Sequence, residues 1–456
     1  MTASWASAVP LLADADVCVV GSGSAGSTAA IAAARTGASV VLVEQQPFLG
    51  GTSTAVLDTF YGFWTPGRVG HKVVGGIGDE VVAGLRRLGG VIERPNTYGA
   101  GTGITYVAEH LKVEWERLVL GAGATVLLHA MLQDVDVDVD EAGRVSSVLV
   151  ATKAGLRRIT ARVFVDASGD ADLCAFGGFG FEMAGEVDPA QTLTTTFRMA
   201  NVDREARARV TRQELHERMA EAARAGYDLP RREGSDHVTP IDGVTATVMT
   251  RLEPNERTAD GQLVNTTDPA FLTAAEIAGR RQALEYARFL VDRVPGYSAA
   301  SLVALGTRIG IRETRRVEGD ARLTRDDVLA ARQFDDQIGL CGAPIEDHRA
   351  GPDTRWTYLP EGSAVGIPYS TLVVRDAANV LLAGRCFSAT HDAHASVRSM
   401  AQCMAMGQAA GVAASLAALA TRGGRGALVR AVDIGDLRRR LAGDGAILDL
   451  PMATAA

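Results

Sequence analysis

In the first fifty residues, apolar runs alternate with glycine-containing turns. The uninterrupted apolar run Val17–Val20 predicts a strand that is buried on both faces. Residues 25–36 are mostly Ala, Ser and Thr, which predicts a tightly packing helix, and Gly37 follows as its expected stop. A second apolar run, Ser39–Val43, ends at Glu44. This order of strand, glycine turn, helix and strand predicts an α/β fold.

Three glycines follow the first predicted strand at the spacing GxGxxG. Gly21 permits a tight turn, Gly23 lets the backbone approach a pyrophosphate, and Gly26 lets the helix lie close to the strand. Ser24 and Ala25 stand at the start of the helix, where backbone N–H groups and a partial positive charge favour phosphate. The turn therefore predicts a phosphate-binding site.

Glu44 completes this motif at the end of the second predicted strand. A carboxylate in that position can accept hydrogen bonds from a ribose diol. The turn and the carboxylate together predict a site for the ADP half of a dinucleotide. The motif alone leaves NAD and FAD open.

The pattern changes twice further along the chain. Residues 124–173 are rich in β-forming residues, and the alternating DVDVDV within them predicts an antiparallel strand with one solvated face. Residues 186–362 combine polar helices at 204–225 and 273–291 with a proline-punctuated loop region near 229–270. Apolar strands then return, followed by a loop with two histidines and a long small-residue helix starting near Ser396.

We therefore expect a discontinuous domain architecture. Residues 14–185 and 363–425 are predicted to form one Rossmann-like domain with a parallel sheet and a β-meander. Residues 186–362 are predicted to form an inserted α+β substrate domain, and residues 426–456 a C-terminal helical tail.

Composition excludes several classes of function. The 456-residue chain carries a net charge of −8 and has no basic tract, which argues against a nucleic-acid partner. Its five cysteines are scattered, so neither a disulfide framework, a metal site nor a redox-active disulfide is expected. The N-terminus lacks a signal-peptide pattern, and the Ala/Gly-rich segment near 409–420 is interpreted as a packed soluble helix and not a membrane span. We expect a cytoplasmic protein; a homo-oligomer stays open.

Three segments favour FAD over NAD. A glycine pair after Glu44 lets a second loop approach the pyrophosphate and the flavin, and a predicted strand over 163–166 ends in a small-residue turn. A strand over 380–382 leads to a glycine and a polar residue near the expected path of a ribityl chain. The residues predicted to contact the cofactor in these segments and in the final helix are Gly50, Gly51, Thr52, Ala167, Ser168, Gly169, Gly384, Arg385 and Ser396.

Motifs along nearly the whole chain carry a resemblance to a known family. They are GSGSAG (21–26), LGGTST (49–54), FVDASGDADL (164–173), TRIGIRETRRVEGDARLTRDDV (307–328), PIEDH (344–348), GIPYSTLV (366–373) and the long segment 381–411. On these residues the chain resembles the FAD-dependent oxidoreductases of the glutathione-reductase-like superfamily. The resemblance implies non-covalent FAD, and it supplies no substrate. Arg385 stands where many relatives carry an acidic residue, a departure that argues against ribityl contact through a carboxylate.

The sequence has no second strand-linked glycine motif, and this limits the classes of reaction that the enzyme is expected to catalyse. The glycines at 99–103 follow polar residues and not a strand, so no dedicated NAD(P)H domain is expected. The favoured scheme is dehydrogenation of a small organic substrate at a C–H, C–OH or C–N group, with hydride transfer to flavin N5. Oxygen, a quinone or a carrier protein would reoxidise the flavin. An ene-type reductase, a non-redox isomerase or lyase, and an electron-transfer subunit are the alternatives.

Two histidines and an arginine in SATHDAHASVRS are the first catalytic candidates. A proton acceptor needs a pKa near neutrality, which suits His391 and His394; alternatively they orient the loop or bind the flavin. Arg398 is placed to hold the flavin C2 carbonyl side or a substrate carboxylate, with a structural salt bridge as the alternative.

Further candidates lie in the substrate domain and near its ends. The spacing of Arg308, Arg312 and Arg315 predicts one face of a helix, for substrate or cofactor binding or for ion pairs with Glu313 and Glu318. His348 is a further candidate for the site. Tyr369 and Tyr61 line either the pocket or the core. His71 is a candidate for covalent flavin attachment, but its sequence context gives no positive support.

Overall fold

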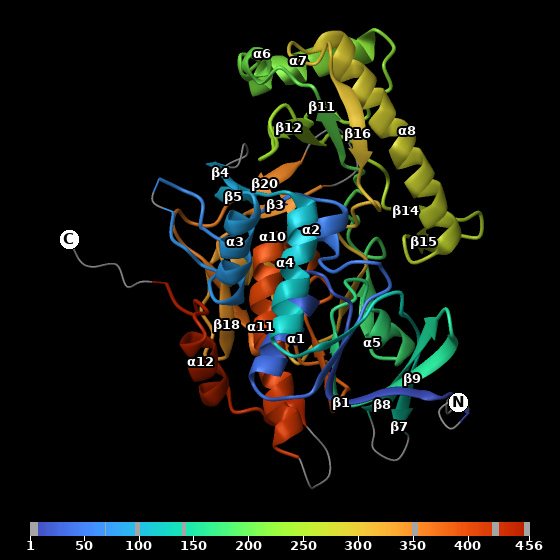
Figure 1. The fold of residues 1–456 in the computed structure, drawn as a ribbon, viewed down its shortest axis with the longest axis vertical. Coiled ribbons are helices and arrows are strands. Elements are labelled where there is room, and N and C mark those ends of the chain that lie inside the picture. The colour runs from blue at the N-terminus through green and yellow to red at the C-terminus, as the bar shows by residue number, and fades with distance from the viewer. Residues whose placement is uncertain are drawn as a thin grey trace, which may run out of the picture.

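The computed structural model describes residues 8–68, 70–95, 101–138, 143–348, 354–421 and 428–450. It is a mixed α/β protein in which a seven-stranded sheet occupies the lower part of the molecule in the view of Figure 1. The strand order is β6-β2-β1-β9-β8-β7, with β22 paired to β9. These strands are β1 (Leu11–Val20), β2 (Val40–Val43), β6 (Thr125–Leu127), β7 (Met131–Asp138), β8 (Arg144–Thr152), β9 (Gly155–Asp166) and β22 (Val380–Leu382).

The first βαβ unit forms where the apolar pattern predicts it. β1 pairs in parallel with β2, with Val17 opposite Val40, and α1 (Ser24–Arg35) connects them. Gly37 follows α1 with φ of +103°, a conformation that suits glycine at a helix end. The predicted FAD-binding Rossmann-like core is thus confirmed, with a longer first strand than the apolar run indicated.

β22 brings the C-terminal part of the chain into the same sheet. The first half of β9 pairs with the antiparallel β8, and its last residues, Phe164–Asp166, pair in parallel with β22. β7 pairs with the antiparallel β8, as predicted for a β-meander; burial alternates over residues 131–133, whereas residues 136–138 are all partly buried. Residues 139–142, at the predicted turn, lie outside the described residues.

Two helices cross the centre of the molecule in close contact. α11 (Met400–Leu419) packs along α1, and Figure 1 shows both beside α4. A Cβ on Gly407 would overlap the carbonyl of Ala25, and one on Gly411 would overlap that of Ala29. The two glycines therefore let the C-terminal helix lie against the first one.

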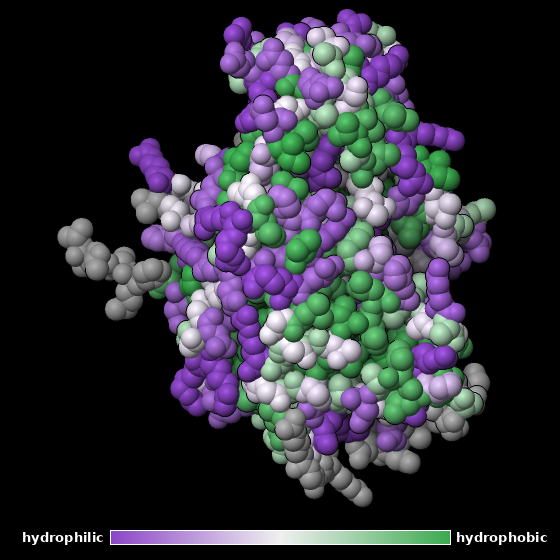
Figure 2. Space-filling model, viewed as in Figure 1, coloured by the Kyte–Doolittle hydropathy of each residue, from purple (hydrophilic) through white to green (hydrophobic). Residues whose placement is uncertain are grey.

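α11 is also long and apolar enough to cross a membrane by length and composition alone. In this structure, 78% of its tested 18-residue window is buried inside the protein. This is the packing of a core helix, as predicted for the Ala/Gly-rich segment. Figure 2 shows that hydrophobic residues also reach the surface over the lower part of the visible face.

A four-stranded antiparallel sheet and three helices form the upper part of the molecule in Figure 1. The sheet has the order β12-β13-β11-β16, and it shares a separate hydrophobic cluster with two of the helices. Its elements are β11 (Phe197–Ala200), α6 (Arg204–Ala208), α7 (Arg212–Arg224), β12 (Ser235–Val238), β13 (Thr245–Val248), α8 (Pro269–Arg293) and β16 (Ser301–Leu305).

Three sequence predictions in the second half of the chain are wrong. The loop region near 229–270 contains β12, β13, β14 (Asn255–Arg257) and β15 (Leu263–Asn265), strands too short and too polar to show an alternating pattern. The two histidines lie on a helix, α10 (His391–Val397), and not in a loop. The long helix begins at Met400 and not near Ser396, because Ser399 has an extended backbone that separates the two helices.

The remaining elements connect or cover these sheets. They are α2 (Thr52–Ala55), β3 (Thr59–Phe60), α3 (Ile77–Leu88), β4 (Ile92–Pro95), β5 (Thr102–Thr105), α4 (Ala108–Gly121), α5 (Asp172–Phe176), β10 (Phe181–Met183), β17 (Arg315–Val317), α9 (Arg325–Leu329), β18 (Gln337–Cys341), β19 (Ile345–Asp347), β20 (Arg355–Thr357), β21 (Val365–Pro368), η1 (Tyr369–Thr371), η2 (Val429–Ala431) and α12 (Ile434–Gly443). α12 is the predicted tail helix, and Leu437 and Leu441 point inward from it. Residues 451–456 of the tail, and 99–100 of the glycine-rich segment, lie outside the described residues.

Candidate active site

The glycine turn between β1 and α1 is crowded in two places and open in a third. Gly21 has φ of +91°, and a Cβ there would lie 2.5 Å from the carbonyl oxygen of Ala167. A Cβ on Gly26 would overlap the carbonyl of Gly21. A Cβ on Gly23 would meet nothing within 4 Å. The free space therefore lies at the glycine where the motif expects a pyrophosphate.

Glu44 is fixed at the end of β2 by three hydrogen bonds. Its carboxylate accepts from Ser22 N at 2.9 Å, from Ser22 Oγ at 2.6 Å and from Gln46 N at 2.8 Å. A carboxylate offers about four acceptor positions, so one remains for a ribose hydroxyl. This geometry fits the predicted role.

The second glycine loop lies directly on the first turn. Gly50 N donates to Ser22 O at 2.8 Å, and a Cβ on Gly51 would lie 2.8 Å from Gly23 Cα. Thr52 then begins α2. We call the β1–α1 turn, Glu44 and this loop the nucleotide cradle.

The turn after β9 closes the cradle and is held by its own side chains. Ser168 Oγ donates to Asp166 Oδ1 at 2.7 Å and accepts from Asp172 N at 2.8 Å. Ala167 packs against Gly21, and Gly169 adopts a φ of +82°. Ser168 therefore shapes the turn, while Ala167 and Gly169 supply the close backbone approach.

Gly384 and Arg385 approach the cradle from the C-terminal part of the chain. A Cβ on Gly384 would lie 2.9 Å from the Cβ of Ala25. Arg385 Nη2 lies 2.8 Å from Asp170 Oδ1. Burial raises the pKa of Asp170, but Arg385 and Arg308 outweigh burial and hold it below its usual value. Asp170 is thus a carboxylate that fixes the Arg385 side chain.

Buried side-chain atoms without a hydrogen-bond partner occur in several parts of the described structure, and five of them lie on the glycine turn, at Arg308 or within segment 381–411. Most buried polar groups in folded proteins are hydrogen-bonded, so a group of exceptions indicates a ligand. Because both donors and acceptors occur among them, they suit the phosphates, ribityl chain and ring edge of FAD. They are Ser24 Oγ, Arg308 Nε, Thr390 Oγ1, His394 Nδ1 and Arg398 Nε.

His391 lies between two buried carboxylates. Its Nδ1 is 3.0 Å from Glu313 Oε2, and its Nε2 is 3.4 Å from Asp347 Oδ1. Burial lowers its pKa, but the hydrogen bonds to Asp347 and Glu313 outweigh burial and raise it to about 9. His391 is therefore an imidazolium at neutral pH, a state that does not suit the proton-accepting role expected from the sequence.

His394 is held in the opposite protonation state. Burial lowers its pKa to about 3, so the ring is neutral. Nε2 lies 2.8 Å from the carbonyl oxygen of Arg385 and must donate to it, which leaves Nδ1 as the acceptor. The ring also stacks on Phe387, with centroids 5.9 Å apart.

The three arginines predicted on one helix face do not lie on a helix. Residues 306–314 form a loop in which Gly310 pairs with Thr194 in an isolated antiparallel bridge, and Arg315 begins β17. Arg315 pairs with Asp172 at 3.0 Å, while Arg312 donates to the carbonyl of Thr192. Arg398 donates to Gln191 Oε1 at 2.8 Å. The structure thus brings Arg312 and Arg398 to adjacent residues and separates Arg315 from them.

Three other candidates make packing contacts. Tyr369 is buried, and its hydroxyl donates to the carbonyl of Val429 at 2.8 Å. Ser396 is buried within α10 and donates to the carbonyl of Ala343 at 2.6 Å. His71 lies beside Thr65, whose hydroxyl accepts from His71 N at 2.9 Å. These contacts assign Tyr369 and Ser396 to the core instead of the site.

His348 and Tyr61 remain near the charged groups. His348 Nε2 lies 3.0 Å from Glu346 Oε1, and burial lowers the His348 pKa to about 3. Burial raises the pKa of Glu346, but His348 and the two arginines outweigh burial and lower it to about 2. The Tyr61 hydroxyl accepts from Arg94 at 3.2 Å.

The structure contains a histidine–aspartate pair that the sequence pattern did not predict. His237 Nε2, on β12, lies 2.8 Å from Asp58 Oδ1. Burial raises the pKa of Asp58, but His237, Arg198 and Arg94 outweigh burial, and the net shift is downward. The two residues are 179 positions apart, and no local motif surrounds either one.

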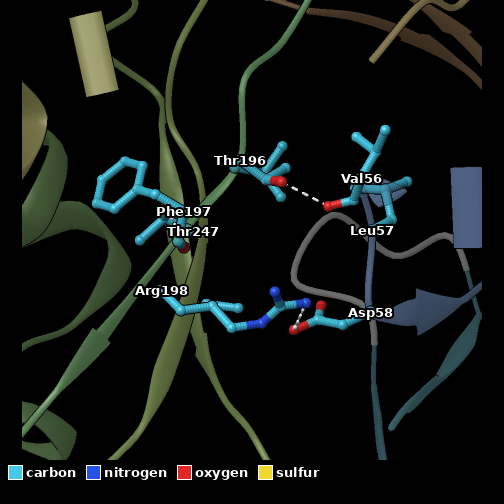
Figure 3. Close-up of a pocket in the computed structure, with 9 residues that line it drawn as sticks. Val56, Leu57, Asp58, Thr196, Phe197, Arg198 and Thr247 are labelled. Carbon is cyan, nitrogen blue, oxygen red and sulfur yellow. Dashed lines mark hydrogen bonds and ion pairs between the residues drawn. The ribbon is translucent and has the colours of Figure 1, made fainter. Parts of the chain in front are cut away.

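Asp58 also lines a small crevice between segment 56–58 and the upper sheet. Figure 3 shows Val56, Leu57 and Asp58 facing Thr196, Phe197 and Arg198, with Arg198 3.7 Å from Asp58. Its volume of about 10 Å³ holds roughly one water molecule. A larger surface hollow of about 450 Å³ contains none of these residues; it is lined by Glu80, Ala83, Arg87 and Arg117.

One group of side chains has the donor types of a metal site. Asp347, His391 and Asp392 place one donor atom each within 4.8 Å of one another. A metal needs a neutral imidazole, whereas two carboxylates keep His391 protonated. The geometry is that of an ion network.

Comparisons with known proteins agree with the cofactor that the nucleotide cradle predicts. A family model described as FAD dependent oxidoreductase matches residues 16–441. A segment of 85 residues is 40% identical to 4-oxocyclohex-2-ene-1-carboxylate 5-dehydrogenase of Sinomonas cyclohexanicum; the match spans 19% of this chain and 13% of that enzyme.

Solved structures show only a distant similarity. BexE, studied for oxidation during BE-7585A biosynthesis, is 18% identical with a TM-score of 0.48, over 96% of this chain and 70% of that one. A geranylgeranyl bacteriochlorophyll reductase-like protein of Thermoplasma acidophilum is 14% identical with a TM-score of 0.45, over 94% and 82% of the two chains. With its cradle and a family match over most of its length, the chain belongs to the FAD-dependent oxidoreductase family and is an enzyme with FAD as its cofactor.

Proposed function

We propose that the enzyme dehydrogenates a small organic substrate by removing a hydride and a proton. FAD, when bound in the cradle, supplies the hydride acceptor. The protein must then supply a proton acceptor and a means of holding the substrate. The observation that carries this proposal is the Asp58–His237 pair, in which Asp58 follows α2 and the Gly50–Gly51 loop of the cradle and His237 comes from β12.

The pair has the arrangement of an oriented base. Asp58 is buried, and the net shift of its pKa is downward, so it is a carboxylate at neutral pH. In the neutral imidazole, His237 Nε2 donates to Asp58 and Nδ1 keeps the lone pair. An imidazole held in this way takes up a substrate proton as the hydride leaves.

The cysteines favour direct hydride removal over a thiol relay. Cys18, Cys174, Cys341, Cys386 and Cys403 are all buried and unpaired by disulfides. Burial raises the pKa of each thiol, to about 11 for Cys341 and to about 12 for Cys18 and Cys403. These groups stay protonated, whereas a disulfide reductase needs a reactive thiolate.

The partial match to a dehydrogenase supports the same choice. The Sinomonas enzyme is named for dehydrogenation of a ring carboxylate, and part of it is 40% identical to this chain. The substrate of this chain, a cytoplasmic location, and reoxidation by oxygen, a quinone or a carrier protein are parts of the proposal that rest on the sequence.

Anaerobic reduction of the FAD-loaded enzyme tests the proposal. A panel of small alcohols, amines and ring ketones is mixed with the enzyme without oxygen, and flavin absorbance and products are followed. We expect a substrate to bleach the flavin in proportion to the product formed. A substrate that is converted catalytically while the flavin stays oxidised would instead establish a non-redox isomerase or lyase.

A further inference from the structure

Two arginines from distant parts of the chain are held next to each other by neutral groups. Arg312 donates to the carbonyl of Thr192 at 2.5 Å, and Arg398 donates to the side-chain carbonyl of Gln191 at 2.8 Å. Gln191 and Thr192 are consecutive residues, and the positive charge of Arg398 lowers the pKa of Arg312, so the two guanidinium groups are close enough to interact. We call Arg312 and Arg398 the arginine pair.

The hydrogen bonds of the arginine pair leave much of its donor capacity unused. A guanidinium has five N–H donors, and the bonds above use one on each residue. The Nε of Arg398 is buried and has no partner. Carbonyl acceptors also bring no negative charge to balance the two cations.

Glu313 and Glu346 attract the arginine pair, but both carboxylates hydrogen-bond to other side chains. Glu313 is engaged by His391 at 3.0 Å and by Arg316. Glu346 attracts both arginines but hydrogen-bonds to the neutral His348 at 3.0 Å. The nearby Arg231 adds a third cation; it is buried and donates to the carbonyl of Val248 at 3.0 Å.

The pKa of Arg312 also indicates an excess of buried positive charge around the arginine pair. Burial lowers it, and the positive charges of Arg398 and Arg231 lower it further, against the attraction of Glu346. A buried guanidinium that lacks a carboxylate partner is costly, and an incoming anion would remove that cost. The planar fork of arginine matches a carboxylate in a bidentate arrangement.

The arginine pair is also close to the groups that carry the chemistry. Arg398 is the first of the two residues between α10 and α11, and its buried Nε is one of the atoms that fit FAD. The field of Glu346 reaches Tyr61, which is three residues from Asp58. Glu346, which also acts on both arginines, thus connects the arginine pair electrostatically to the segment that carries Asp58.

We propose that the arginine pair binds a carboxylate of the substrate, so that the enzyme acts on carboxylic acids. This inference rests on the proposed function, because it concerns the substrate of the same reaction. Arg312 is the principal anchor, and Arg398 shares the anion while it closes the site beside the cofactor. Neutral His348 and the Gln191 amide complete the polar surroundings.

Binding to the oxidised, FAD-loaded enzyme tests the inference without turnover. Acetate, benzoate and succinate are compared with acetamide, benzamide and succinamide by calorimetry, and inorganic phosphate is added as a second anion. We expect at least one acid to bind at least about tenfold more tightly than its amide, a difference of about 1.4 kcal/mol. Arg312→Gln should abolish this preference, and Arg312→Lys should restore part of it because the charge returns without the fork.

A surface arginine provides the control. Arg280 is exposed on α8 and pairs with Glu276 at 3.0 Å, so Arg280→Gln should keep the preference. FAD content is measured first for every variant, and Arg398→Gln serves as the second probe if Arg312→Gln does not fold. No preference of wild type for any acid, an unchanged preference in the folded variant, or tighter binding of phosphate than of every acid would overturn the inference.

The outcomes separate this inference from the proposed function. Flavin bleaching by neutral substrates alone would leave dehydrogenation standing and remove the carboxylate site. Preferential binding of an acid that is converted without flavin reduction would keep the carboxylate site and remove dehydrogenation.

Discussion

His391 Nδ1 lies 3.0 Å from Glu313 Oε2, although the two residues are 78 positions apart. Asp347 faces the other ring nitrogen at 3.4 Å. The three residues join α10 to the loop before β17 and to β19, so the ion network fixes the helix that leads to Arg398. We therefore assign His391 to positioning, whereas the sequence pointed to catalysis.

The His391 network predicts a loss of stability as pH rises. The folded-state pKa of about 9 lies above the unfolded value of 6.5, so this contribution is present below pH 6.5 and is lost as pH rises toward 9. The full loss corresponds to about 3 kcal/mol as an upper estimate. Chemical unfolding between pH 6.5 and 9 should show the decline in wild type and a flatter profile in His391→Asn.

The pH range from 6.5 to 9 reports on His391 and not on the two neutral histidines. His394 and His348 have folded-state pKa values of about 3, so their contribution is present above pH 6.5 and is lost only as pH falls from 6.5 toward 3. They do not contribute to a decline between pH 6.5 and 9. Equal slopes in wild type and His391→Asn over that window would contradict an imidazolium at residue 391.

Gly23→Ala should weaken FAD binding without weakening the fold. The added Cβ meets nothing within 4 Å in the protein and so occupies the space that the motif reserves for the pyrophosphate. We expect FAD affinity to fall by about tenfold or more, with an unchanged unfolding midpoint of the apoprotein. Fluorescence titration of apoprotein with FAD measures the first and thermal unfolding the second. Wild-type affinity in the folded variant would argue against this phosphate site.

Gly407→Ala should instead lower the stability of the fold. Its Cβ would overlap the carbonyl of Ala25 and push α11 away from α1. Overpacking of this kind costs about 1–3 kcal/mol, which denaturant unfolding measures. Gly121→Ala on α4 is the matched control, because its Cβ meets nothing within 4 Å and should leave stability unchanged or slightly raised. A stable Gly407→Ala variant would refute the close α1–α11 contact.

His237→Gln should slow flavin reduction by about 100-fold or more, because the side chain loses its basic nitrogen. Asp58→Asn should do the same by disturbing the imidazole tautomer. Both variants should retain FAD, since neither residue belongs to the cradle. Stopped-flow reduction under anaerobic conditions gives the rate, and a wild-type rate in FAD-loaded His237→Gln would remove this residue from the mechanism.

The five thiols should react with an aromatic disulfide reagent only after unfolding. All of them are buried, and burial raises their pKa values. Absorbance of the released thiolate, read before and after denaturant, counts the reactive groups. Rapid labelling of any thiol in the native enzyme would reopen a cysteine relay.

The cofactor end of the site could be predicted because its signals are local. Gly21, Gly23 and Gly26 lie within six residues, and the steric reason for each glycine is a property of the turn itself. Glu44 follows from the length of one helix and one strand. The same logic correctly placed β22 in the first sheet, since its apolar run suits a strand buried on both faces.

The substrate end depends on contacts that no local pattern reports. The spacing of Arg308, Arg312 and Arg315 suggested a helix, but tertiary pairing of Gly310 with Thr194 draws this segment into an extended course. His391 looked like a free base because neither Glu313 nor Asp347 is near it in sequence. Asp58 and His237 were missed for the same reason.

The most direct test is the mass of the product formed per flavin reduced. FAD-loaded enzyme is incubated without oxygen with the carboxylic acid that binds most tightly and reacts, and flavin absorbance is compared with product mass. The account predicts one product, lighter by two hydrogen atoms, for each flavin bleached. A product of unchanged mass formed while the flavin stays oxidised would contradict it.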